Sequence, residues 1–94
     1  MKDWYLYIAR CSSGALYTGI ALNPEERIRK HNRGKGSKAV KALGLPVVLE
    51  YQTLMGTKSK ALQAEAFIKS LSKERKEKFL LITSVDWGQS WEKE

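Results

Sequence analysis

The chain has 94 residues, a formal net charge of +7 and a 43% share of hydrophobic residues. This length predicts one domain with one modest core, and the hydrophobic share excludes a disordered chain. No apolar run approaches the roughly 18 residues that a membrane-spanning helix needs, and the N-terminus predicts no signal peptide. Because Cys11 is the single cysteine and cannot form an internal disulfide, we expect a cytoplasmic protein.

Residues 4–20 predict a β-hairpin, with a polar turn around Gly14. Side chains alternate between the two faces of a strand, so one face collects an almost wholly apolar set. This set is predicted to be the buried face and consists of Trp4, Leu6, Ile8, Leu16, Thr18 and Ile20. Tyr5, Tyr7 and Tyr17 then lie on the opposite face, pointing away from the core.

The register of the hairpin decides which residues of that second face are neighbours. If Ala9 pairs with Ala15, Tyr7 lies directly across from Tyr17, and slips by an even number keep both on one face. Gly19 beside them leaves the backbone bare, as a closely approaching ligand would need. The alternative is that the tyrosines pack a second, half-buried face, since tyrosine favours strands.

A helix is predicted from about residue 24 to residue 33. Asn23 is a good N-cap, Pro24 suits the first helical position, and Gly34 ends the pattern. Arg27 and His31 are four residues apart and therefore share one face of this helix.

The remaining pattern predicts a short helix, a third strand and two more helices, at residues 38–44, 45–54, 59–71 and from 72 onward. We therefore expect an α+β fold, with a small three-stranded antiparallel sheet flanked by helices. Residues 1–82 form the predicted domain. Residues 83–94 form a C-terminal tail with Trp87 and Trp91, which either packs back on the domain or is loosely held.

A basic segment without acidic residues runs from Arg27 to Leu49. Such a cluster is typical of a protein that binds a polyanion, and we favour nucleic acid over a solvated surface without a partner. Besides Arg27, which shares a helix face with His31, the predicted nucleic-acid-binding residues of this segment are Arg29, Lys30, Arg33, Lys35, Lys38 and Lys41.

One carboxylate stands out on the helix predicted at 59–71. The apolar face of this helix is predicted to hold Ala61, Ala64, Phe67, Ile68 and Leu71, and Glu65 lies at the edge of that face. A carboxylate there is costly unless it is paired or binds a metal. A salt bridge to Lys69, four residues on, and a metal ligand are the two alternatives.

The order of these features resembles the GIY-YIG nuclease family. "YLY" at residues 5–7 is similar to the GIY motif and "YTG" at 17–19 to the YIG motif. "NPEERIRKHNRGKGSKA" is similar to the segment that carries the family's arginine and histidine, and "SKALQAEAFIK" to the helix that carries its glutamate. The likeness is strongest to small standalone bacterial GIY-YIG proteins and to the nuclease domain of structure-selective junction endonucleases.

The resemblance implies a role for five residues. It assigns catalysis to Tyr7, Tyr17, Arg27 and His31, and metal binding to Glu65. The first motif lacks its glycine, a late asparagine of some members has no convincing counterpart, and Ile20 stands where some members place a lysine. The general base therefore stays open, with Tyr17 positioning or deprotonating the water and Tyr7 or His31 relaying the proton.

The implied function is a metal-dependent endonuclease that hydrolyses phosphodiester bonds with Mg²⁺ or Mn²⁺, with DNA favoured over RNA, in repair or recombination. No membrane is expected as a partner. A partner protein or a homodimer would supply targeting. Two alternatives are a nucleic-acid-binding module that has lost turnover and a basic structural protein in which the tyrosines and Glu65 merely pack.

Overall fold

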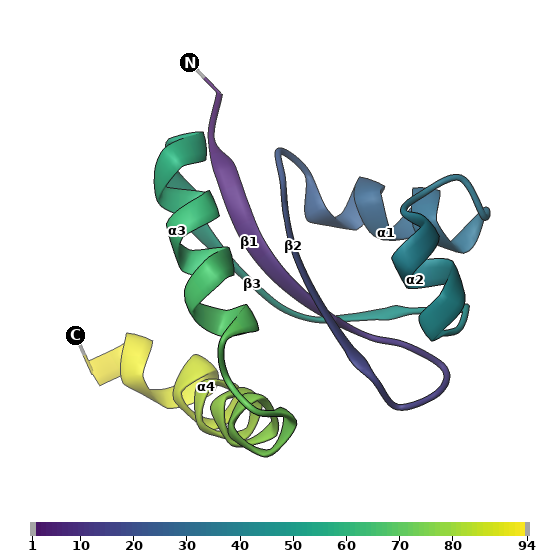
Figure 1. Ribbon diagram of the computed structural model, residues 1–94. Helices are drawn as coiled ribbons and strands as arrows, with labels where there is room; N and C mark the ends of the chain where they lie inside the picture. The colour runs from purple at the N-terminus through teal and green to yellow at the C-terminus, as the bar shows by residue number, and fades with distance from the viewer. Residues whose placement is uncertain (1, 94) are drawn as a thin grey trace.

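A three-stranded antiparallel sheet runs through the middle of the protein (Figure 1). The computed structural model describes residues 2–93, and the side chains of residues 2–83. The elements follow in the order β1 (Trp4–Arg10), β2 (Leu16–Ala21), α1 (Pro24–Asn32), α2 (Lys38–Leu43), β3 (Val48–Gly56), α3 (Lys58–Lys69) and α4 (Lys73–Lys93). The strands lie in the order β2-β1-β3, so β1 is central and β2 and β3 are edge strands. This arrangement confirms the predicted α+β fold.

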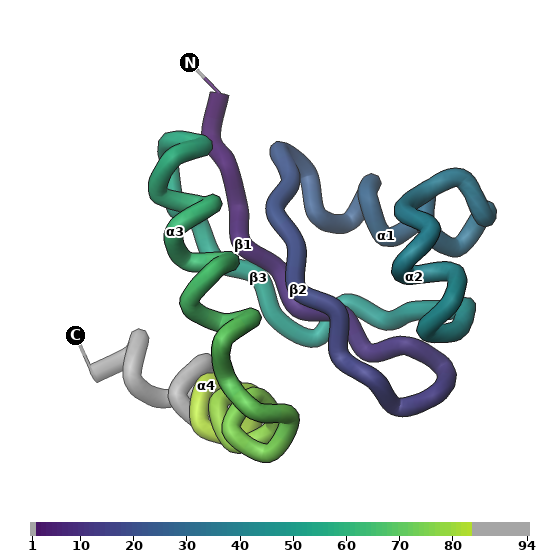
Figure 2. Tube along the Cα trace, viewed as in Figure 1, coloured from purple at the N-terminus to yellow at the C-terminus, as the bar shows by residue number. Residues whose placement is uncertain are grey.

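Helices cover both faces of the sheet. Figures 1 and 2 show α1 and α2 on one side of the strands and α3 on the other. One core cluster on the α1 side contains Tyr7, Ala9, Cys11, Ala21, Ile28, Val40 and Val47. A second cluster on the α3 side contains Leu6, Ile8, Ile68 and Leu80. The sheet is therefore buried on both faces.

The prediction that the tyrosine face points away from the core is wrong for Tyr7. Its side chain is 1% exposed and belongs to the cluster under α1 and α2, and Tyr17 packs against the same cluster. Alternation along a strand separates two faces, but it does not tell whether a later helix covers the second one. The apolar face predicted for α3 is also wrong at Phe67, which is 64% exposed.

The register of the hairpin differs by two residues from the predicted one. Ala9 pairs with Tyr17, and Tyr7 pairs with Gly19. Because the slip is an even number, Tyr7 and Tyr17 still share a face. At the start of β1 the pairing with β3 shifts between Trp4 and Tyr5. Such an irregularity re-aims a side chain, and Trp4 is half-buried and lies outside both core clusters.

The helix boundaries follow their capping residues. The side chain of Asn23 accepts a hydrogen bond from the backbone N–H of Glu26 at 3.1 Å, and Gly34 follows α1 with a φ of 77°. The side chain of Thr57 caps α3 by accepting a hydrogen bond from the backbone N–H of Lys60. Between them, Ser37 caps α2, which confirms the short helix. The prediction for the side chains of Trp87 and Trp91 lies outside the described residues.

None of the helices within residues 2–93 combines the length and the apolar character that a membrane span requires.

Candidate active site

Three aromatic rings meet on the α1 side of the sheet. Tyr7 comes from β1, Tyr17 from β2 and His31 from the last turn of α1. The hydroxyl oxygen of Tyr7 lies 3.1 Å from Nε2 of His31, within hydrogen-bonding distance. The ring centroid of Tyr17 lies 6.2 Å from that of Tyr7 and 5.7 Å from that of His31. The structure thus brings together three of the predicted site residues.

Two glycines make room for these rings. A Cβ atom on Gly19 would lie 2.7 Å from the hydroxyl oxygen of Tyr7 and 2.8 Å from its Cζ. A Cβ atom on Gly36 would overlap Nδ1 of His31. The expectation that Gly19 leaves space for a ligand is therefore wrong, because the phenol of Tyr7 lies over this glycine.

Both partners of the Tyr7–His31 hydrogen bond are neutral near pH 7. Burial raises the pKa of Tyr7, the neighbouring Tyr17 and Glu65 raise it further, and Arg27 lowers it. Burial lowers the pKa of His31, and the positive charges of Arg27 and Lys30 add to this effect. Tyr7 is consequently a poor base, and His31 is an uncharged imidazole.

The surroundings of His31 favour one tautomer. Its Nδ1 atom is buried against Gly36 and has no hydrogen-bond partner among the described residues. A buried N–H without an acceptor is rarer in proteins than an unused acceptor. We therefore assign the proton to Nε2, which donates to the oxygen of Tyr7. The hydroxyl hydrogen of Tyr7 is then left to donate to another group.

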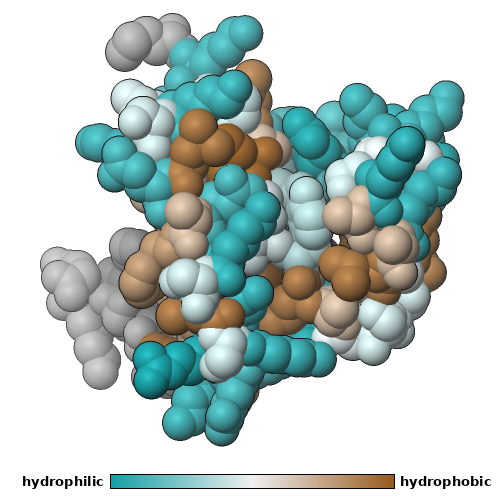
Figure 3. Space-filling view, viewed as in Figure 1, coloured by the Kyte–Doolittle hydropathy of each residue, from teal (hydrophilic) through white to brown (hydrophobic). Residues whose placement is uncertain are grey.

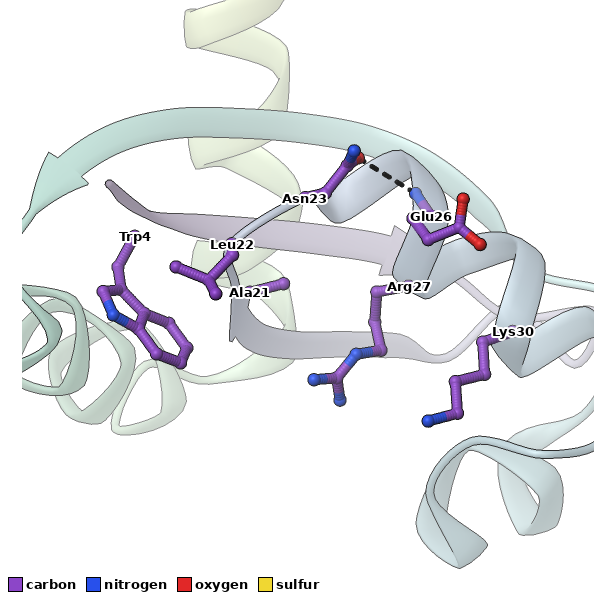
Figure 4. A pocket seen from close by; sticks show the side chains of 7 residues that line it. All are labelled: Trp4, Ala21, Leu22, Asn23, Glu26, Arg27 and Lys30. Atoms are coloured by element: carbon purple, nitrogen blue, oxygen red, sulfur yellow. Dashed lines mark hydrogen bonds between the residues drawn. The ribbon is translucent and has the colours of Figure 1, made fainter. Parts of the chain in front are cut away.

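Arg27 lies on the exposed side of this ring cluster. It is carried by α1, and its charge acts on both Tyr7 and His31. Its side chain also lines a surface pocket of about 260 Å³ (Figure 4), together with Trp4, Ala21, Leu22, Asn23, Glu26 and Lys30. An arginine in this position combines access to solvent with proximity to the tyrosines, as contact with a substrate phosphate requires.

Glu65 approaches from the other side of the sheet. It is carried by α3, which packs against the face of Leu6 and Ile8. Its carboxylate pairs with Lys69 at 3.2 Å, and the Glu65 side chain is 19% exposed. The negative charge of Glu65 nevertheless raises the pKa of Tyr7. The carboxylate therefore lies within electrostatic reach of the ring cluster, although α3 and α1 lie on opposite faces.

The five residues predicted for the site are not equally open to solvent. Tyr7 and His31 are each 1% exposed, so a substrate cannot contact their rings freely. Arg27 is exposed, and Tyr17 and Glu65 are partly exposed. Of the five predicted residues, these three are the ones that a ligand can reach.

The six residues predicted to bind nucleic acid are all exposed. Hydrophilic side chains cover α1 and the loop after it in Figure 3. Arg29 has its own partner, since its guanidinium lies 2.8 Å from the carboxylate of Glu26. Because these six basic side chains are exposed, the positive charges of α1, α2 and the loop between them are accessible to a polyanion.

Comparison of the sequence with models of known protein families shows which family the chain belongs to. The model of the GIY-YIG catalytic domain matches residues 3–78. The chain belongs to the GIY-YIG family. This match confirms the resemblance that the motifs predicted, and it extends over the ring cluster, Arg27 and Glu65. GIY-YIG domains are nuclease domains, so contact with nucleic acid is the function that the family implies.

Relatives of this GIY-YIG chain include small proteins named UPF0213. One from Staphylococcus saprophyticus is 46% identical over 80 residues, which cover 85% of this chain and 96% of that protein. One from Aeromonas salmonicida is 41% identical over 91 residues, which cover 95% of this chain and 66% of that longer protein. This chain thus spans about two thirds of the Aeromonas relative.

Two solved structures have the same fold. The solution NMR structure of UPF0213 protein BH0048 from Bacillus halodurans is 32% identical and superposes with a TM-score of 0.56, covering 85% of this chain and 84% of that one. The solution NMR structure of EF2693 from E. faecalis is 33% identical with a TM-score of 0.60, covering 90% of each chain.

Two residues that position the site in this GIY-YIG chain were not predicted. Gly36 packs against His31. Asn32 binds Val47, the residue just before β3. Its side-chain amide accepts a hydrogen bond from the backbone N–H of Val47 at 2.7 Å and donates one to the Val47 carbonyl at 3.1 Å. The glycine is visible in the sequence, but its partner depends on how the loop folds back. Nothing in the sequence distinguishes Asn32 from any other polar residue at the end of a helix.

Proposed function

We propose that this GIY-YIG chain is a metal-dependent endonuclease that hydrolyses phosphodiester bonds in nucleic acid, with DNA as the favoured substrate. The observation that carries the proposal is the ring cluster of Tyr7, Tyr17 and His31, in which the hydroxyl oxygen of Tyr7 lies 3.1 Å from Nε2 of His31. A cation, a carboxylate and tyrosine hydroxyls are groups that suit the attack of water on a phosphate.

Arg27 would bind the scissile phosphate. Its guanidinium has a planar fork of donors that matches phosphate oxygens, and it is exposed beside the ring cluster. As the water oxygen bonds to phosphorus and the bond to the leaving oxygen breaks, negative charge grows on the remaining oxygens. The guanidinium stabilises that charge.

The two tyrosines would have different roles. Tyr7 is buried and its pKa is raised, so it keeps its proton and donates a hydrogen bond. His31 holds the phenol of Tyr7 in place through Nε2. Tyr17 is partly exposed and lies next to both rings, so it is the tyrosine that can reach the attacking water. We therefore assign the positioning of water to Tyr17.

Glu65 would hold a single Mg²⁺ or Mn²⁺ ion. Among the described residues there is no group of three or more carboxylate, histidine or cysteine ligands that could enclose a metal. Mg²⁺ commonly binds to one or two carboxylates and keeps several waters or substrate oxygens, so a lone Glu65 fits this ion. When bound, the ion supplies Lewis-acid stabilisation of the phosphate. Binding of the ion at Glu65 would compete with the ion pair that its carboxylate forms with Lys69 at 3.2 Å.

The experiment is a cleavage assay on a panel of labelled substrates. Flapped, branched, nicked and single-stranded DNA and single-stranded RNA are incubated with purified protein and Mg²⁺, Mn²⁺ or a chelator. We expect metal-dependent cleavage of at least one DNA and no cleavage with the chelator. If the protein binds these substrates and cuts none of them with either metal, it is the binding module instead.

A further inference from the structure

The pocket next to Arg27 has two unlike walls. Trp4, Ala21 and Leu22 form an apolar wall, and Arg27 and Lys30 extend from α1 on the other side (Figure 4). The volume of about 260 Å³ is smaller than the roughly 300 Å³ at which drug-sized sites begin. It suits a single planar group better than a whole small molecule.

The indole of Trp4 is held in position at this pocket. The pairing of β1 with β3 shifts directly after Trp4, which separates this side chain from the core face of Leu6 and Ile8. The ammonium group of Lys58 lies 5.1 Å from the centroid of the indole. A cation at this distance is attracted to the ring and restrains the orientation of the indole.

The charges around the pocket favour a phosphate beside the planar group. Arg27 and Lys30 line it, and Lys58 lies over the indole. Glu26 is the one acidic residue among those that line it, and Arg29 pairs with its carboxylate at 2.8 Å. Aromatic rings next to cationic side chains are the combination with which proteins bind single-stranded nucleic acid.

We propose that this pocket binds an unpaired nucleobase of DNA, stacked on Trp4, while Arg27 binds the phosphate attached to the same nucleotide. The inference rests on the proposed nuclease function, and it names the substrate class. Arg27 lies between the pocket and the ring cluster, so it links the bound base to the bond that is cut.

A base in a continuous duplex cannot enter such a pocket. It is paired and stacked on its neighbours, and its release costs a few kcal/mol. A flap, a gap or a single strand offers the base without this cost. The chain therefore selects DNA with an unpaired nucleotide next to the scissile phosphate.

The test compares two probes that differ only in their bases. Fluorescence anisotropy in a chelating buffer measures the binding of a labelled oligothymidylate and of a labelled abasic strand of the same length. Both carry the same phosphates. We expect the wild-type protein to bind the oligothymidylate about 5- to 100-fold more tightly, which corresponds to the stacking of one base.

Variants of Trp4 connect this preference to the pocket. Trp4→Leu keeps an apolar side chain without a ring and should lose most of the preference, while its affinity for the abasic strand stays unchanged. Trp4→Phe keeps a smaller ring and should retain part of the preference. Lys30→Gln should weaken the binding of both probes, because both present phosphates. A melting curve of each variant verifies folding.

Two results would overturn the inference. One is equal affinity of the wild-type protein for both probes, which needs no variant. The other is a full preference for the oligothymidylate in a folded Trp4→Leu protein. Cleavage is measured separately with Mg²⁺: a nuclease without base preference contradicts the pocket alone, whereas a Trp4-dependent base preference without cleavage contradicts the nuclease function alone.

Discussion

Tyr7 and His31 owe their positions to two residues without side chains. The phenol of Tyr7 lies over Gly19, and the imidazole of His31 lies against Gly36. Both rings are fully buried and joined by a hydrogen bond. A buried polar pair is costly to disturb, because each partner would lose its bond without access to water. At this scale the site depends on shape as much as on the chemistry of the reacting groups.

Gly19→Ala tests this dependence on shape. The new Cβ would lie 2.7 Å from the hydroxyl oxygen of Tyr7 and must displace the phenol. We expect a folded protein, destabilised by about 1–3 kcal/mol through overpacking, with a cleavage rate lower by about 100-fold through misplacement. A melting curve and a single-turnover cleavage assay measure the two effects. A folded Gly19→Ala protein that cuts at the wild-type rate would contradict the role of Tyr7.

The lowered pKa of His31 predicts how stability depends on pH. In the unfolded chain His31 takes up a proton near pH 6.5, whereas in the folded protein burial keeps it neutral to lower pH. The free energy of unfolding should therefore rise as the pH increases toward about 6.5, and the contribution of His31 should be constant above it.

Urea titrations of wild type and His31→Gln across this range measure the effect. The variant should lose part of the rise between the folded-state pKa and about pH 6.5, because its side chain does not titrate. Identical pH profiles of the two proteins would show that His31 is not the titrating group.

The elements are tied together by a few polar side chains. Asn32 at the end of α1 binds both backbone groups of Val47, just before β3. Arg10 at the end of β1 binds Glu50 of β3 at 3.1 Å and Glu77 of α4 at 2.8 Å. These bonds hold the end of α1 and the beginning of α4 against the sheet. The position of His31, one residue before Asn32, depends on the first of them.

Asn32→Ala should therefore destabilise the protein. It leaves the N–H and the carbonyl of Val47 without their partner, and we expect a loss of about 1–3 kcal/mol in the free energy of unfolding. Asn32→Asp is the matched control, since its carboxylate still accepts from the Val47 N–H and should recover part of the loss. Urea unfolding measures the stability of both variants. An unchanged stability of Asn32→Ala would show that this contact does not stabilise the protein.

Local sequence signals predicted the helices and strands well. Contacts between residues that are distant along the chain could not be predicted from the sequence. Asn23, Pro24 and Gly34 mark the ends of α1, because capping depends on residues next to one another. The register of the hairpin, the irregularity after Trp4 and the burial of Tyr7 depend on strands and helices that are distant along the chain. For the site, the sequence identified the candidate residues through the family motifs, but not the glycines that shape it.

On the scale of the whole molecule, α1 and α3 lie on opposite faces of the sheet (Figure 1), and each carries one charged residue of the site. Arg27 comes from the layer of α1 and Glu65 from the layer of α3, and both act on the phenol of Tyr7. The basic residues of α1, α2 and their connecting loop extend this region with exposed positive charge. Binding of DNA should therefore depend on many weak phosphate contacts in addition to the site itself.

The salt dependence of DNA binding tests that surface. Each lysine that neutralises one phosphate contributes about 0.9 to the slope of log affinity against log salt concentration on duplex DNA. Replacing Lys35, Lys38 and Lys41 by alanine should flatten this slope, measured by anisotropy at several salt concentrations. An unchanged slope would move the binding surface elsewhere, for example to the basic start of α4, with Lys73, Arg75, Lys76 and Lys78.

In the proposed mechanism, Glu65 holds a catalytic metal ion and is not merely the partner of Lys69. The decisive measurement is Mg²⁺-dependent cleavage, with binding and a melting curve on the same DNA, for Glu65→Gln and Lys69→Met. Each variant removes the 3.2 Å ion pair, but only the first removes the carboxylate. We predict that Glu65→Gln binds DNA and does not cut it, while Lys69→Met still cuts. A folded Glu65→Gln protein that cuts at the wild-type rate would contradict the mechanism.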